Sequence, residues 1–215
     1  MFKTQFAIRE FSLPMMIWML LGAGIIFGTD KLDLHLWINQ LNHPLTDTIF
    51  RYLTHLGDGI FAGLIVLIIF FYKIRYAVIG LVGVFGSGIF SQLLKRLIYD
   101  DHYRPSKVFE SLADLHFVDG VILYSRHSFP SGHATTAFAL FLFLAFLAPY
   151  KWVRAVCFGL AIVTAFSRVY ISQHFFEDIY VGSLIGFTFM YAAIIFINSK
   201  NWGDRGLLSQ FDSKK

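Results

Sequence analysis

Residues 130–149 read PSGHATTAFALFLFLAFLAP, in which a short polar stretch is followed by a nearly unbroken apolar run. Ser131 and Gly132 are residue types typical of a helix start, where unpaired backbone N–H groups need acceptors. The run that follows has no polar face, so a helix over residues 134–149 requires apolar surroundings on all sides. The stretch therefore predicts a membrane helix whose polar first turn lies at one edge of the bilayer.

The chain as a whole has the composition of an integral membrane protein. Of its 215 residues, 56% are hydrophobic and 15% are charged, whereas about 25% are charged in an average soluble domain. Phenylalanine (25 residues) outnumbers tyrosine (10) and tryptophan (4). This composition excludes a disordered chain, a nucleic-acid-binding arm and a disulfide-stapled secreted module. We expect one membrane domain over residues 1–215.

Six stretches approach the roughly 20 apolar residues that a helix needs to cross a bilayer. The second qualifies only if His55 and Asp58 lie at the interface, and the fourth and fifth are short or interrupted by Arg154 and Arg168. Residues 31–55 are typical of an interfacial segment. We therefore expect an all-α polytopic membrane protein with outer interfacial helices and six transmembrane helices, over residues 11–28, 53–72, 76–94, 134–149, 152–171 and 179–198.

Six spans place both termini on one side of the membrane. The termini and loops on that side carry ten basic and three acidic side chains, and all eight histidines fall on the other side. Because short cationic loops stay in the cytoplasm, we expect cytoplasmic termini in a bacterial-type inner membrane. The histidines then gather on the extracytoplasmic side, where the loops are longest.

Three clusters of polar residues lie at the outer ends of different spans. Each has an ordinary interpretation when taken alone: basic residues as interfacial anchors, a serine as a helix start, and a His–Asp pair as a structural hydrogen bond. The predicted topology brings all three to one face. They are Lys95-Arg96 with Arg104-Pro105, then Pro130-Ser131-Gly132-His133, and then Ser167-Arg168 with His174 and Asp178.

Together these residue types suit the transfer of a phosphoryl group, whose charge is stabilised by fixed cations and amide donors. Cations come from Lys95, Arg104 and Arg168, and donors from Ser131 and the backbone of Gly132. His174 is the candidate nucleophile, since Asp178 four residues later can hold its Nδ1 proton. His133 remains as the general acid for the leaving alkoxide.

The combination resembles the type 2 phosphatidic acid phosphatase family of membrane lipid phosphatases. Its second and third signatures match without a change of spacing, at residues 130–133 and 167–178. The first departs, because its lysine would fall on Leu97, so we take Lys95 with a two-residue expansion and keep Arg96 as the substitute. The resemblance implies a six-helix core, a phosphohistidine on His174, His133 as acid, Asp178 as its orienting partner, and neither metal nor cofactor.

Several interpretations stay open from the residues alone. Arg96, Lys107 and Arg126 are candidates for contact with a second phosphate or a headgroup. A metal cluster drawn from His102, His116 and His127 with nearby aspartates lacks the short ligand spacing of a zinc site. Phe109, Phe117 and Phe129 are candidates for the border of an acyl entrance.

The leading hypothesis is a metal-independent phosphatase with its active site outside the cytoplasm, acting on phosphatidylglycerol phosphate, phosphatidic acid, undecaprenyl diphosphate or a lipid A phosphate. Its expected partners are the phosphorylated lipid and the bilayer, with no nucleic acid and no obligatory protein. The alternatives are a lipid phosphotransferase with the same site, an intramembrane serine protease using Ser131, and a transporter.

Overall fold

The computed structural model describes residues 8–199 and 202–203. Within these ranges the chain is helical and contains no strand. In chain order the elements are α2 (Arg9–Gly28), α3 (Lys31–Asn39), α4 (Pro44–Leu53), η1 (Thr54–Gly57), α5 (Gly59–Tyr72), α6 (Ile74–Gly80), η2 (Leu81–Phe85), α7 (Gly86–Leu97), α8 (Pro105–Val108), η3 (Phe109–Ser111), α9 (Gly132–Leu147), α10 (Lys151–Tyr170) and α11 (Phe176–Asn198). The prediction of an all-α polytopic membrane protein is confirmed.

Four helical stretches of the described chain are long and apolar enough to cross a membrane: α2, the continuous run from α6 to α7, α10 and α11. A fifth arises if α4 with η1 and α5 form one span, and these two parts meet at a bend of 50°. The predicted span over residues 53–72 is therefore not continuous, because the chain turns at Asp58. This count of four or five is close to, but lower than, the six transmembrane helices that we predict from the sequence.

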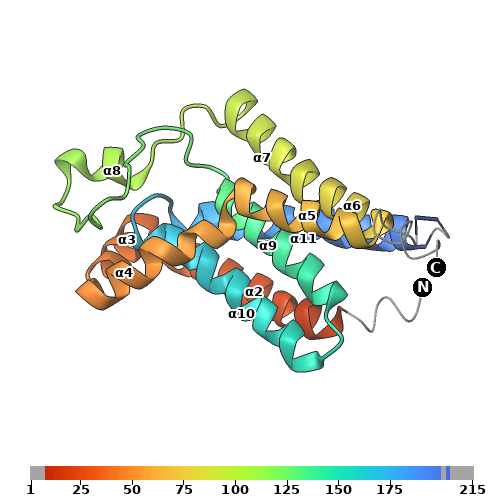
Figure 1. Cartoon of the computed structure of the whole chain (residues 1–215). Helices are drawn as coiled ribbons and strands as arrows, with labels where there is room; N and C mark the ends of the chain where they lie inside the picture. Colours follow the sequence, from red (N-terminus) through yellow and green to blue (C-terminus); the bar gives the residue numbers. More distant parts are fainter. Residues whose placement is uncertain (1–7, 200–201, 204–215) are drawn as a thin grey trace.

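The stretch 134–149 differs from the other predicted spans because its helix lies inside the bundle. α9 has only 16 residues, and every residue from Ala134 to Phe143 is buried. Its most extensive contacts are with α10 and α11, and the helices from η1 to α7 also contact it (Figure 1). An apolar sequence all round the helix is thus explained by a protein environment rather than by lipid.

Two glycines of α11 let its backbone approach α9 closely. A Cβ atom on Gly186 would lie 2.1 Å from the carbonyl oxygen of Thr135, and one on Gly182 would lie 2.5 Å from that of Ser131. Small residues at such crossings allow backbones to touch, as is common between membrane helices. At the end of this contact the Ser131 N–H donates to the Asp178 carbonyl over 3.0 Å. The α9–α11 contact therefore sets the distance between the second and third motifs.

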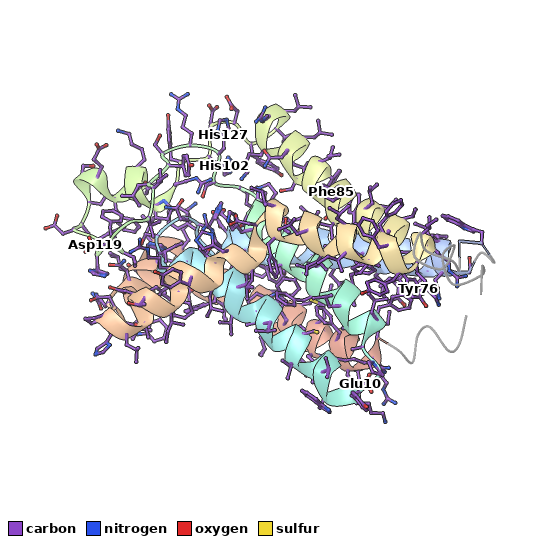
Figure 2. The ribbon with its side chains drawn as sticks, viewed as in Figure 1. Glu10, Tyr76, Phe85, His102, Asp119 and His127 are labelled. Carbon is purple, nitrogen blue, oxygen red and sulfur yellow. The ribbon has the colours of Figure 1, made fainter. Side chains whose placement is uncertain are left out.

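The two ends of the bundle differ in character. The turns from α5 to α6 and from α9 to α10 lie at one end, marked in Figure 2 by Glu10 and Tyr76. At the other end lie α3, α4 and the long segment 98–131, marked by His102, Asp119 and His127 (Figure 2). The predicted interfacial segment 31–55 forms the two short helices α3 and α4 at this second end. The three motifs meet at this end.

The basic side chains that support the predicted topology fall in part outside the described residues. Lys3, Lys200, Arg205, Lys214 and Lys215 belong to that part. Those that the structure describes, such as Lys73 and Lys151, lie in the turns at the end opposite the motifs.

Candidate active site

The third motif forms a buried His–Asp pair in the turn between α10 and α11. His174 is 1% exposed, and its Nδ1 lies 3.2 Å from Oδ2 of Asp178. The same carboxylate oxygen accepts hydrogen bonds from the Phe175 N–H (2.9 Å) and from the Ser128 hydroxyl. Asp178 is therefore held from three directions, and it can fix the orientation of the His174 ring. Ser128 carries no signal in the sequence that would single it out.

His174 has the protonation state that a nucleophile needs. Burial, followed by the positive charges of Arg104, Lys95 and Arg168, holds the pKa of His174 well below its usual range. The ring is therefore neutral near pH 7, and with Nδ1 facing Asp178 its lone pair resides on Nε2.

The three predicted cations approach this pair from three different elements. Lys95 lies in the last turn of α7 and is 6% exposed, and Arg168 lies near the end of α10 and is 7% exposed. Arg104 lies in segment 98–131, where its Nη1 donates to Oε1 of Gln173 over 2.9 Å. Gln173, directly before His174, is a positioning contact that the motif analysis did not include.

Arg168 has an unpaired donor in a buried place. Its Nη1 donates to Oγ1 of Thr54 over 2.8 Å, whereas its Nε is buried and has no hydrogen-bond partner among the described residues. Buried guanidinium groups are normally fully paired, so a free donor beside two other cations indicates room for an anion.

The second motif begins α9, as its sequence predicts. Ser131 is the N-cap residue, and its hydroxyl accepts a hydrogen bond from the Ala134 N–H over 3.4 Å. The backbone N–H groups of Gly132 and His133 belong to the first turn, which is the part of a helix that binds anions. The ring of His133 is held by an unexpected partner, since its Nε2 lies 2.8 Å from Oδ1 of Asp58.

Burial distinguishes the two candidates for the lysine of the first motif. Lys95 points into the cationic cluster, whereas Arg96 beside it is exposed. Both line a polar pocket of about 490 Å³ together with Gln92, Asp100, Arg104, Tyr124, Arg126 and His127. Burial therefore favours Lys95 over Arg96 as the candidate for the signature lysine, and Arg96 lies at the rim of the pocket.

The metal-cluster interpretation is wrong for the described part of the chain, where no three potential metal ligands converge. His116 pairs with Asp47 (2.7 Å) and His127 pairs with Asp100 (2.6 Å), so the histidines are dispersed among separate carboxylates. Lys107 pairs with Glu110 on the surface. Phe109 is buried between His35 and Phe175, which removes it as a candidate for the acyl entrance.

A second, mostly apolar groove reaches the site from the side of the bundle. It has a volume of about 540 Å³ and runs between α7, the start of α5 and the start of α9, ending at Gly132 and His133. Three of its lining residues have exposed apolar side chains that face outward: Phe85 (40%), Ile89 (62%) and Leu93 (50%). The groove shares Gln92 and Arg96 with the polar pocket, so the two are adjacent.

A membrane-embedded helical core that gathers two histidines and three cations at one end has the architecture of a membrane phosphatase, an enzyme that hydrolyses phosphoric esters. The family model of the PAP2 superfamily matches residues 76–202. This range is more than half of the chain and contains all three motifs, so the chain belongs to the PAP2 superfamily.

Two curated relatives are named lipid A 4'-phosphatase. The protein from Porphyromonas gingivalis is 25% identical over 181 residues, which cover 78% of this chain and 74% of that protein. The protein from Bacteroides thetaiotaomicron is 30% identical over 83 residues, covering 39% of this chain. The second match spans only 37% of the relative's own length.

Two solved structures share the fold. The crystal structure of Aquifex aeolicus LpxE aligns with a TM-score of 0.67 and 24% identity, covering 77% of this chain and 95% of that one. The transmembrane PAP2 type phosphatidylglycerolphosphate phosphatase from Bacillus subtilis aligns with a TM-score of 0.63 and 24% identity, covering 87% and 95%. At this identity the likeness establishes a common fold.

Proposed function

We propose that this PAP2 phosphatase removes a phosphate from a membrane lipid through a phosphohistidine on His174, at a site outside the cytoplasm. The observation that carries the proposal is the adjacency of the polar pocket and the apolar groove. A lipid phosphate has a charged head and apolar chains, and it needs both kinds of surface side by side. A soluble phosphate ester would leave the apolar groove unused.

The chemistry follows from the positions of the charged groups. Nε2 of His174 attacks phosphorus while Lys95, Arg104 and Arg168 stabilise the charge on the peripheral oxygens. His133 donates a proton to the departing alkoxide oxygen, which leaves as the lipid alcohol. Water then attacks the phosphohistidine, gives a proton back to His133, and releases inorganic phosphate from Nε2 of His174.

Two observations favour a large, polyanionic headgroup such as that of a lipid A type substrate. The polar pocket contains Arg96 and Arg126 in addition to the buried cations, so it can pair with more than one anionic group. Relatives that match this chain are also named lipid A 4'-phosphatase. Phosphatidylglycerol phosphate, phosphatidic acid and undecaprenyl diphosphate are the competing substrates.

The orientation of the site is supported by the distribution of basic residues. Arg9, Lys73 and Lys151 lie at the end of the bundle opposite the motifs. Because short basic turns remain in the cytoplasm, this distribution supports an active site on the extracytoplasmic face.

The proposal is tested with purified protein in detergent and a panel of the four lipid phosphates, with excess chelator present throughout. We expect release of inorganic phosphate that persists with chelator, fastest for the lipid A type substrate. The His174→Ala variant is expected to release none and to form no acid-labile phosphoprotein. Hydrolysis by this variant at the wild-type rate would contradict the phosphohistidine mechanism.

The same assay separates the alternatives. A phosphotransferase would transfer labelled phosphate to an added acceptor lipid in preference to water. A transporter would release no phosphate from any lipid in detergent, where there is no membrane to cross.

A further inference from the structure

Residues 54–58, THLGD, belong to none of the three motifs, yet they touch the site at two points. The segment forms η1 and the bend that precedes α5, and it packs against α9 and α10. Thr54 accepts a hydrogen bond from Arg168, and Asp58 contacts His133. We call residues 54–58 the bend segment.

The carboxylate of Asp58 is directed toward histidine rings on both sides. Oδ1 lies 2.8 Å from Nε2 of His133, and Oδ2 lies 2.8 Å from Nδ1 of His55. Asp58 is also the N-cap residue of α5, a position where an aspartate ordinarily accepts hydrogen bonds from the first turn. Here its side chain makes no such bond. The helix start therefore does not explain the presence of a carboxylate at this position.

A close contact holds the bend segment against the first turn of α9. A Cβ atom on Gly57 would lie 2.8 Å from the carbonyl oxygen of His133 and 3.2 Å from its Cβ atom. A residue larger than glycine would push the segment away from His133. The Asp58–His133 contact thus depends on a backbone approach that glycine makes possible.

We infer that Asp58 is a positioning residue for the general acid: it holds the His133 ring by Nε2 and stabilises the protonated form that the first step consumes. This inference rests on the function proposed above. It assigns to the bend segment a role in the departure of the lipid alcohol, which is distinct from the role of Asp178 at the nucleophile.

The electrostatic reason lies in the surroundings of His133. The charged and titratable groups that face it are Arg168 from α10, Arg104 from segment 98–131, His174 from the turn before α11, Arg96 from α7, and Asp58 with His55 from the bend segment. Cations oppose a further positive charge on the ring, and a carboxylate in contact favours it. Asp58 is the anion in direct contact with this ring.

The proton balance requires no change of charge on Asp58. The leaving oxygen takes the Nδ1 proton of the protonated ring, whereas Nε2 keeps its own proton beside the carboxylate, so His133 is left neutral next to an ionised Asp58. The attacking water then returns one proton to Nδ1 as its oxygen bonds to phosphorus. Asp58 remains a carboxylate throughout, in the manner of the orienting acid of other catalytic histidines.

The test exploits the leaving group. An alkoxide needs the proton from His133, whereas the p-nitrophenolate of p-nitrophenyl phosphate departs without much help. For Asp58→Asn we expect kcat/KM to fall about 30-fold with a lipid phosphate monoester that carries two short alkyl chains. With p-nitrophenyl phosphate we expect kcat/KM to fall less than about threefold. The alkaline limb of the lipid pH profile should also move down by roughly one unit. Asp58→Glu should recover part of the lipid activity.

Two further variants keep the outcome decisive. His55→Ala removes the outer contact of Asp58 and leaves the contact with His133, so we expect activity on both substrates within about threefold of wild type. In a His133→Asn background, Asp58→Asn should have little additional effect, because the ring that it positions is gone.

The possible failures are distinguishable. Equal loss on both substrates in Asp58→Asn, or an equal loss in His55→Ala, would identify the bend segment as a purely structural element and overturn the inference. Unchanged lipid activity in Asp58→Asn would overturn it as well. The proposed function itself fails if the wild-type protein hydrolyses no lipid phosphate, or if His174→Ala hydrolyses it at the wild-type rate.

Discussion

Each of the two candidate catalytic histidines contacts an aspartate, and the two His–Asp pairs are built in opposite ways. His174 and Asp178 are four residues apart, on one turn and the helix that follows it, and their side chains are 2% and 1% exposed. His133 and Asp58 come from different helices, and their side chains are 30% and 36% exposed. The first pair is buried, and the second is partly exposed at the rim of the site.

In the proposed mechanism, this difference corresponds to two tasks in one reaction. A nucleophile must keep one lone pair in a fixed direction, and burial beside an immobilised carboxylate achieves this. A general acid must meet a leaving group that is still joined to a large lipid, so it lies where the apolar groove opens. In this mechanism the pair His174–Asp178 affects the rate of hydrolysis of every substrate. The pair His133–Asp58 affects the rate mainly for substrates whose leaving group is poor.

The largest effect is expected from Asp178→Asn, the counterpart of the Asp58 variant. An amide cannot hold the Nδ1 proton of His174 as a carboxylate does, so the attacking lone pair is lost for part of the time. We expect kcat to fall about 10³-fold on lipid and aryl phosphates alike. Steady-state kinetics with both substrates measure this, and a loss confined to the lipid would break the distinction between the two pairs.

A smaller loss of activity is expected when a cation is removed. The neighbours Lys95 and Arg96 provide a matched pair of variants. Lys95→Ala removes a buried charge and should lower kcat about 100-fold. Arg96→Ala removes an exposed charge next to it and should raise KM for the lipid about threefold while leaving kcat unchanged. The reverse order of effects would show that Arg96, not Lys95, fills the place of the signature lysine.

The backbone contact below the exposed pair gives a third prediction. Gly57→Ala inserts a Cβ against the His133 carbonyl oxygen, and we expect about a tenfold loss of lipid activity with little loss on p-nitrophenyl phosphate. Gly59→Ala is the control, since no atom lies within 4 Å of its added Cβ. Equal activities of the two variants would mean that the bend segment adapts without moving Asp58.

The smallest effect concerns stability rather than turnover. His35 is 1% exposed, and burial lowers its pKa to about 4. Its folded pKa lies below the unfolded value, so the unfolded chain binds more protons, and stability present above about pH 6.5 is lost as the pH falls. From pH 7 to pH 5 we expect a loss of about 2 kcal/mol from this group.

Thermal unfolding in detergent at several pH values measures the change in stability, and His35→Gln should flatten the dependence. The residual slope in that variant reports the remaining titratable groups, among them the buried pair His174 and Asp178. A slope unchanged by the substitution would show that folding does not shift the pKa of His35.

Much of the fold follows from local patterns. Long apolar stretches predict α2, α10 and α11 to within a few residues. Unpaired backbone groups are costly in lipid, and a helix pairs all of them within one segment. For residues 134–149, the apolar pattern predicts a helix but does not predict its location. An apolar helix in lipid and one inside a bundle have the same sequence character, so only packing shows that α9 is the core.

In the candidate site, too, some contacts are predictable from the sequence and others are not. His174 with Asp178, and Ser131 with Gly132, are visible because their partners are close in sequence and share a turn. Asp58, Ser128 and Gln173 are not visible, since their partners are distant in the chain and no periodicity connects them. Asp58 at a helix start even has an ordinary explanation as a cap, which the structure does not support.

The sequence by itself determined that this protein is a helical membrane protein, and it singled out the candidate residues for phosphoryl transfer, because hydropathy and motif spacing act over one or two helical turns. Only the tertiary structure decided that Lys95 is the buried lysine, that α9 lies at the centre, and that a carboxylate from the bend segment meets His133. The physical reason is that burial and charge pairing are sums over neighbours from several helices. Those neighbours are set by how the helices pack.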